Sequence, residues 1–346
     1  MTVRSVIVAA VTLLVTAGSV YAQDGDTGKK EKVIGKWYPE AEAGVTLSQS
    51  AFSDNWAGGD KGSIVWTAIF NASLQSQLHK KINFYNILKL AYGQTHQQKA
   101  DADGGRYWEK PAKSTDLIDL ETIFRFTLGG WVDPYVSGRF ESQFEDASDP
   151  AGRMLSLNPM KFKQSGGIAR KFIDTEEEAL LSRFGFTFRE SRRKVFANPA
   201  PDQTTASETS VDGGLEWTID YKAKILSERV AWTSKFTAYK PVFYSGSDEF
   251  DAVTGDKLEA AGFDRDLSDY PMMVDLDWEN IFSTQITKIL SVNLYVRWVY
   301  DKYENSVIPM LNDDGDITNP GAIGGAIRKA GQFKQTLAIG LTYRLL

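Results

Sequence analysis

The sequence predicts an all-β protein, an antiparallel up-and-down transmembrane β-barrel of about twelve strands. Three observations predict it. Apolar and polar side chains alternate along most of the chain after Trp37, the alternating segments are longer than strands of soluble proteins, and short links follow long ones in turn.

The alternation divides each segment into two faces. In residues 179–190, Phe184, Phe186 and Phe188 fall on one face, and Arg183 and Arg189 fall on the other. Because the apolar face recurs on nearly every segment, a closed sheet would turn it toward lipid and would turn the charged face toward the lumen. Closure also leaves no unpaired strand edge in the bilayer.

Segment length separates a membrane barrel from a soluble sandwich. The segments have roughly 12–15 residues, whereas soluble strands average about 5–6 and a tilted membrane strand needs about 9–11. The alternation is weakest in 159–172, where Lys161, Lys163 and Gln164 interrupt it, so ten or fourteen strands stay open as alternatives. The expected segments, in order, are 40–52, 63–78, 82–95, 115–128, 131–145, 159–172, 179–191, 209–224, 228–240, 270–285, 288–302 and 332–346.

The links predict which end of each strand faces which side. Short periplasmic turns and long outer loops are typical of outer-membrane barrels. Twelve strands then leave both chain ends in the periplasm. The expected short links are 79–81, 129–130, 173–178, 225–227 and 286–287, and the long ones are 53–62, 96–114, 146–158, 192–208, 241–269 and 303–331.

Three regions follow one another along the chain. Residues 1–22 have a basic start, an apolar run too short to span a bilayer and a small final residue, which is typical of a secretory signal peptide. Residues 23–36 are small and polar and are expected to form a flexible periplasmic leader. Residues 37–346 are expected to form the barrel.

The composition speaks against several other classes. The chain has no Cys and two His, at positions 79 and 96, so we expect no disulfide, no enzymatic activity, no metal site and no cofactor. A net charge of −6 gives no basic footprint for nucleic acid. Residues 312–316 resemble a calcium loop, but Ile317 stands where that loop needs Gly; we favour a turn at Asp314-Gly315, and loose calcium binding stays open.

The last segment resembles the C-terminal signal of outer-membrane barrels. Gly340 is followed three residues later by the aromatic Tyr343, and Leu345 lies two residues further. The barrel assembly machinery reads such strands by edge pairing. We therefore expect this machinery and outer-membrane lipid as partners, and the outer membrane of a Gram-negative cell as the location.

A loop motif and three further stretches resemble a known family. They are residues 53–63 (SDNWAGGDKGS), Asn86 to Gly93, Lys113 to Asp116, and Asn158-Pro159. Over most of residues 37–190 the chain is similar to the uncharacterised family called domain of unknown function 3078 (DUF3078), which implies an outer-membrane barrel and no particular activity.

Within the loop motif, two roles stay open. The residues concerned are Asn55, Trp56, Gly58 and Gly59. The motif is either a structured turn with Trp56 packed on the rim, which we favour because Asn and Gly suit turns, or a ligand anchor or constriction.

Ionisable residues of both signs are expected on the lumen face. Arginines concentrate on the fourth, fifth and seventh segments and acids on the tenth, so one wall would be cationic and the opposite wall anionic, as in a pore constriction. Alternatively, neighbouring charges pair and fill a narrow barrel. The candidate lumen residues are Arg125, Arg139, Glu141, Arg183, Arg189, Asp275, Asp277, Glu279 and Arg297.

Two functions follow from these alternatives. The first is a passive, porin-like channel for small solutes with a charged lumen. The second is a non-conducting structural or surface-interaction barrel that its own ion pairs plug. Strand number does not decide between them, because a lumen of twelve strands lies between the filled eight-stranded and the open sixteen-stranded case.

Overall fold

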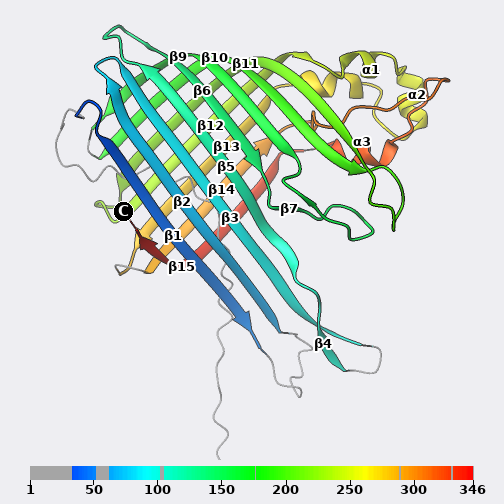
Figure 1. Ribbon diagram of the computed structural model, residues 1–346, viewed down its shortest axis with the longest axis horizontal. Helices are drawn as coiled ribbons and strands as arrows, with labels where there is room; N and C mark the ends of the chain where they lie inside the picture. Colours follow the sequence, from blue (N-terminus) through cyan, green and yellow to red (C-terminus); the bar gives the residue numbers. More distant parts are fainter. Residues whose placement is uncertain are drawn as a thin grey trace, which may run out of the picture.

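The computed structural model describes residues 33–51, 62–101, 105–175, 177–287, 290–328 and 330–345. Twelve long antiparallel strands form one closed barrel, as the alternation predicts (Figure 1). The short-turn end of the barrel lies at the left of Figure 1, where the C-terminus is marked. The strands are β1 (Trp37–Ser50), β2 (Ser63–His79), β3 (Ile82–Ala100), β5 (Ala112–Phe126), β6 (Asp133–Ser142), β9 (Met160–Asp174), β10 (Glu178–Phe196), β11 (Thr205–Ile225), β12 (Val230–Tyr244), β13 (Asp275–Gln285), β14 (Leu290–Tyr300) and β15 (Gln332–Arg344).

Short turns and longer loops alternate around the barrel, as expected. The segment in which alternation was weakest, 159–172, forms β9 and pairs with both β6 and β10. Three short strands lie within the long loops: β4 (Arg106–Trp108), β7 (Glu145–Asp146) and β8 (Leu155–Ser156). None of the helices in the described ranges is long and apolar enough to cross a membrane.

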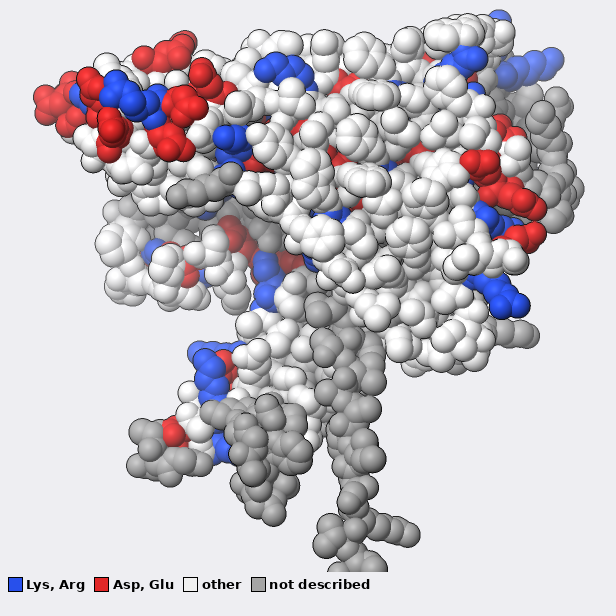
Figure 2. All heavy atoms as spheres, turned by 180° about the vertical axis from the view of Figure 1, so that it is seen from behind, with Lys and Arg blue, Asp and Glu red and all other residues white. Residues whose placement is uncertain are grey.

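The outer wall is largely apolar, and three tryptophans form hydrogen bonds with polar side chains on it. Phe184, Phe186 and Phe188 are exposed on β10, whereas Arg183 and Thr187 between them are buried. The indole of Trp278 donates a hydrogen bond of 3.0 Å to the Ser234 hydroxyl, and the indoles of Trp217 and Trp232 make similar bonds to Ser182 and Asn280. Figure 2 shows that charged side chains gather toward the two ends of this face.

The barrel closes between β1 and β15, and this seam is the most weakly paired. Only Glu42 to Val45 of β1 pair with Leu341 to Arg344 of β15, four register positions. Each other pair of neighbouring barrel strands has at least eight. Residues 332–340 of β15 therefore pair with β14 alone, and residues 46–50 of β1 pair with β2 alone.

Two long links fold together into a small unit, where the sequence predicted plain loops. The β12–β13 link contains α1 (Ser247–Asp251), α2 (Gly255–Ala260) and η1 (Leu267–Met272), and the β14–β15 link contains α3 (Pro320–Ala326). The prediction of a strand from residue 270 was wrong at its start, because residues 270–272 belong to η1, which packs into this unit.

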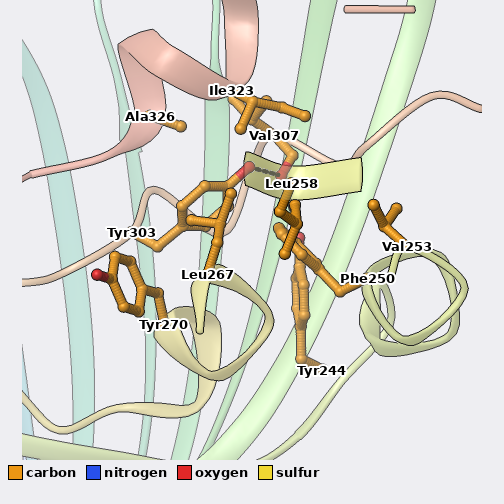
Figure 3. Packing of buried hydrophobic residues seen from close by; sticks show 10 residues of the cluster. All are labelled: Tyr244, Phe250, Val253, Leu258, Leu267, Tyr270, Tyr303, Val307, Ile323 and Ala326. Carbon is orange, nitrogen blue, oxygen red and sulfur yellow. Dashed lines mark hydrogen bonds between the residues drawn. The ribbon is translucent and has the colours of Figure 1, made fainter. Parts of the chain in front are cut away.

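The unit has a hydrophobic core of its own. Its buried side chains come from the end of β12 and from both links, and Figure 3 shows Phe250, Leu258 and Tyr303 facing one another. The core residues are Tyr244, Phe250, Val253, Leu258, Leu267, Tyr270, Tyr303, Val307, Ile323 and Ala326. The two links thus hold each other at the long-loop end of the barrel.

Candidate functional site: a lumen crossed by ion pairs

The charged faces predicted from the alternation line the lumen. At its centre the guanidinium of Arg183 on β10 contacts Asp220 on the adjacent β11 (Nη2 to Oδ2, 3.1 Å) and Glu121 on β5 (Nη1 to Oε1, 3.4 Å). Because β5 and β10 are three strands apart in the wall, the second contact passes through the lumen. Arg183 and Asp220 are both buried.

Glu121 also faces a cation from the far wall. The Nζ atom of Lys235 on β12 lies 4.0 Å from its Oε2 atom. Since β5 and β12 are five positions apart in a ring of twelve strands, this contact spans nearly the whole barrel. Lys163 on β9 pairs with the buried Glu216 on β11 close to the same point.

Arg139 on β6 completes the centre. Its Nε and Nη2 atoms donate to the two carboxylate oxygens of Asp119 at 2.8 and 2.9 Å, and its Nη2 atom also lies 2.8 Å from Glu141. Such two-pronged Arg–carboxylate contacts are the strongest and most directional ion pairs in proteins. They fix the guanidinium against the β5–β6 wall.

These central side chains leave little free volume. They enclose a cavity of about 20 Å³, lined by Glu121, Arg139, Lys163, Arg183 and Glu216 among others. A volume of this size holds about one water molecule. The cavity itself is too small to hold a hydrated ion.

The first two acids of β13, Asp275 and Asp277, lie nearer the long-loop end, where they contact arginines. Arg189 donates to Asp212 (2.7 Å) and Asp275 (3.1 Å), and its guanidinium lies 3.7 Å from the ring centre of Tyr239. Because Arg189 belongs to the expected cationic wall and Asp275 to the anionic wall, this pair joins the two.

The other candidates on β13 also have partners. Arg297 forms a two-pronged pair with Asp277 at 2.8 and 2.6 Å. Glu279 accepts a hydrogen bond of 2.9 Å from the Tyr295 hydroxyl. Arg125 lies near the short-turn end, with its Nε atom 3.8 Å from Asp133. The structure thus gives each of these candidates a partner, which the alternation of the sequence does not provide.

A second ion-pair contact across the barrel, at the long-loop end, was not predicted. Residues 301–328, which we call the cap, follow β14, and their Glu304 side chain reaches Lys161 on β9 at 3.0 Å and Arg328 at 2.8 Å. Because β14 and β9 are five positions apart in the ring, the Glu304–Lys161 pair connects the cap with the opposite wall. Arg328 also pairs with Asp301, which anchors the cap at the end of β14.

Charge and burial stabilise the Glu304 carboxylate. Burial alone raises its pKa, but the ammonium of Lys161 and the guanidinium of Arg328 outweigh that effect and lower the pKa to about 2. Glu304 is therefore ionised at neutral pH. Tyr303 and Val307 beside it are buried in the core of the loop unit, and such apolar residues are the only signal in this link that could have indicated a folded unit.

The acidic stretch 312–316 is a turn. The Asn312 side chain accepts hydrogen bonds from the backbone N–H of Asp314 (3.1 Å) and Asp316 (2.8 Å), and Gly315 has a φ of +74°. The Lys257 ammonium lies 3.1 Å from Asp316. In the described parts of the chain, no group of three or more acidic or His side chains is arranged to hold a metal ion.

The remaining candidates lie away from the lumen centre. Tyr343 on β15 and Leu345 directly after its end are exposed, and Gly340 lies against Thr46 of β1 at the seam. The loop motif Asn55, Trp56, Gly58 and Gly59, the signal peptide and most of the leader lie outside the described residues.

The comparison with known families agrees with the resemblance seen in the sequence. Residues 47–147 match the family model described as "Protein of unknown function (DUF3078)". The matched residues begin within β1 and end directly after β7. The match confirms the expected resemblance over that stretch. No curated protein matches the sequence.

Two solved structures are similar to the chain with low identity. One is an outer membrane channel from Pseudomonas putida F1, with a TM-score of 0.39 and 10% identity over 92% of this chain and 99% of the other. Another is the β domain of the Bordetella autotransporter BrkA, with a TM-score of 0.28 and 8% identity over 89% of this chain and 98% of the other.

Proposed function

We propose that this DUF3078-like chain is an outer-membrane barrel that does not conduct in its resting state, the second of the two functions expected from the sequence. The observation that carries the proposal is the contact of Glu121 with Arg183 and Lys235, which brings three parts of the wall together in the lumen. The cavity of about 20 Å³ at this level supports it.

The orientation follows from the turns. The short-turn end faces the periplasm and the loop unit faces outward, because outer-membrane barrels have this asymmetry. The apolar wall supports lipid as its surrounding, and the exposed Tyr343 of β15 and Leu345 just after it support recognition by the assembly machinery. The role we propose is structural or surface-interacting rather than enzymatic.

The cap provides the surface that an outer partner would meet. It is joined to β9 by Glu304 and Lys161 and to the rest of the loop unit by the buried core. A folded outer unit that also covers the lumen suits a barrel that presents a surface, whereas a passive porin requires an open path along its axis.

A solute-flux experiment tests the proposal. Liposomes that contain the wild-type barrel should swell in isotonic arabinose no faster than protein-free liposomes. The variant Glu121→Ala/Lys235→Ala with Glu304→Gln removes one charge of each sign from the lumen centre and also the contact of the cap with β9, and it should allow swelling. Swelling of wild-type liposomes at the rate of the variant would show a passive channel instead.

A further inference from the structure

A second, larger cavity lies at the short-turn end of the barrel. It has a volume of about 470 Å³ and is bounded by the turn between β5 and β6 and by the end of β9. Small-molecule sites in proteins commonly have about 300–1,000 Å³. The side chains that matter for its chemistry are Arg125, Trp131, Asp133, Arg170, Lys171 and Asp174.

The charges around this cavity favour an anion. Three cationic side chains, Arg125, Arg170 and Lys171, line it together with two carboxylates, Asp133 and Asp174, which leaves a local charge of +1 in a chain whose net charge is −6. Lys171 and Asp174 neutralise each other at 3.0 Å. The chemistry therefore depends on the two guanidinium groups.

Both guanidinium groups keep hydrogen-bonding capacity. Arg125 is 3.8 Å from Asp133, which is too long for a hydrogen bond. Arg170 forms no ion pair with any described residue, and Arg125 Nε and Arg170 Nη1 are buried nitrogens without a hydrogen-bond partner. Unsatisfied buried donors are costly, so a ligand that draws these side chains into hydrogen bonds gains that free energy.

Aromatic rings hold one of the two groups in place. The Arg170 guanidinium lies 4.2 Å from the ring centre of Trp131 and 5.1 Å from that of Phe172. Both rings are exposed at the barrel rim, Trp131 by 75%. Aromatic residues at a rim mark the membrane–water interface, which is also the depth of lipid phosphates.

We propose that this cavity binds a phosphate group between Arg125 and Arg170. Guanidinium groups match phosphate oxygens in geometry as well as in charge, and a partly desolvated cavity strengthens that contact. The phosphate comes either from a phospholipid headgroup of the leaflet at this end or from a soluble phosphate compound. The site is distinct from the central ion pairs, so it does not depend on whether the lumen conducts.

Native mass spectrometry of the full barrel in a neutral detergent tests the site with three probes: phosphatidylglycerol, diacylglycerol with the same acyl chains, and inorganic phosphate. Wild-type protein should bind a phosphate-bearing probe, and Arg170→Gln and Arg125→Gln should each weaken that binding roughly tenfold or more. Arg192→Gln is the matched control, because Arg192 is an exposed arginine paired with Glu190 at the other end of the barrel. Retained heat-modifiable migration in gels shows that each variant is folded.

The probes distinguish the source of the phosphate. Binding of phosphatidylglycerol but not of inorganic phosphate supports a lipid headgroup, and binding of both with equal sensitivity to Arg170→Gln supports a soluble phosphate compound. Equal binding of diacylglycerol and phosphatidylglycerol, or equal binding to wild type and folded Arg170→Gln and Arg125→Gln variants, overturns the proposal.

Discussion

Removing the charge of Glu304 should release the cap from the opposite wall. The side chain accepts from Lys161 at 3.0 Å and from Arg328 at 2.8 Å, and these cations lower its pKa from 4.5 to about 2. One pKa unit corresponds to about 1.4 kcal/mol, so the charged form contributes about 3 kcal/mol to the closed state. Glu304→Gln keeps the size of the side chain and loses this contribution.

A thiol buried within the cap reports the release. The chain has no Cys, and Ser306 is buried beside Glu304, so Ser306→Cys provides a single, nearly isosteric probe. If labelling requires cap opening, a loss of about 3 kcal/mol raises the labelling rate about 100-fold in the Glu304→Gln background.

A matched variant separates the cap contact from a general loss of surface charge. Glu259→Gln removes a carboxylate of the same loop unit that pairs with Arg265 in the solvent, and exposed pairs contribute little. We expect its labelling rate to equal that of Ser306→Cys alone. A rate for Glu304→Gln within about twofold of the same reference would refute the cap argument.

Four more results are expected. The lowered pKa makes the Glu304 carboxylate stabilise the closed cap above pH 4.5, and this stabilisation is lost as the pH falls to about 2. The wild-type cap should therefore become sensitive to pepsin as the pH falls through this range. Glu304→Gln should show no such increase in its cleavage rate, when each rate is normalised to that of the denatured chain. Arg183→Met leaves Glu121 and Asp220 without this partner and should lower the free energy of unfolding in urea by about 3 kcal/mol. Arg297→Met breaks a pair that is about two-fifths exposed and should lower the same free energy by about 1 kcal/mol or less. Trp278→Phe should cost about 1 kcal/mol in the same assay, and Ser234→Ala in that background should recover most of it, because the double variant leaves no unsatisfied hydroxyl. Hydrogen–deuterium exchange should be faster in residues 332–340 than in β11, which pairs on both sides, and equal protection of the two would show that the seam is fully paired.

The strand pattern could be predicted because a barrel repeats one simple rule. Lipid outside and paired charges inside impose a period of two on every strand, as Phe184 and Arg183 illustrate. A mean hydropathy of −0.30 hides this pattern, because it averages the two faces. The charged lumen residues followed from the same parity.

The sequence could not predict which side chains contact each other across the lumen. The alternation places Glu121 and Lys235 on the same face of the sheet, but only the size and shape of the closed barrel bring the Lys235 Nζ atom to 4.0 Å from the Glu121 Oε2 atom. The cap was missed for another reason. Its anchor Glu304 lies in a link rich in turn residues, and its core is shared with a second link more than thirty residues earlier, so neither link shows a periodic signal alone.

Ion conductance in a planar bilayer tests the closed lumen most directly. Wild-type barrel inserted at neutral pH should give no regular current steps, whereas the Glu121→Ala/Lys235→Ala variant with Glu304→Gln should give steps of uniform size. Regular steps from the wild-type protein, equal in size to those of the triple variant, would contradict the account.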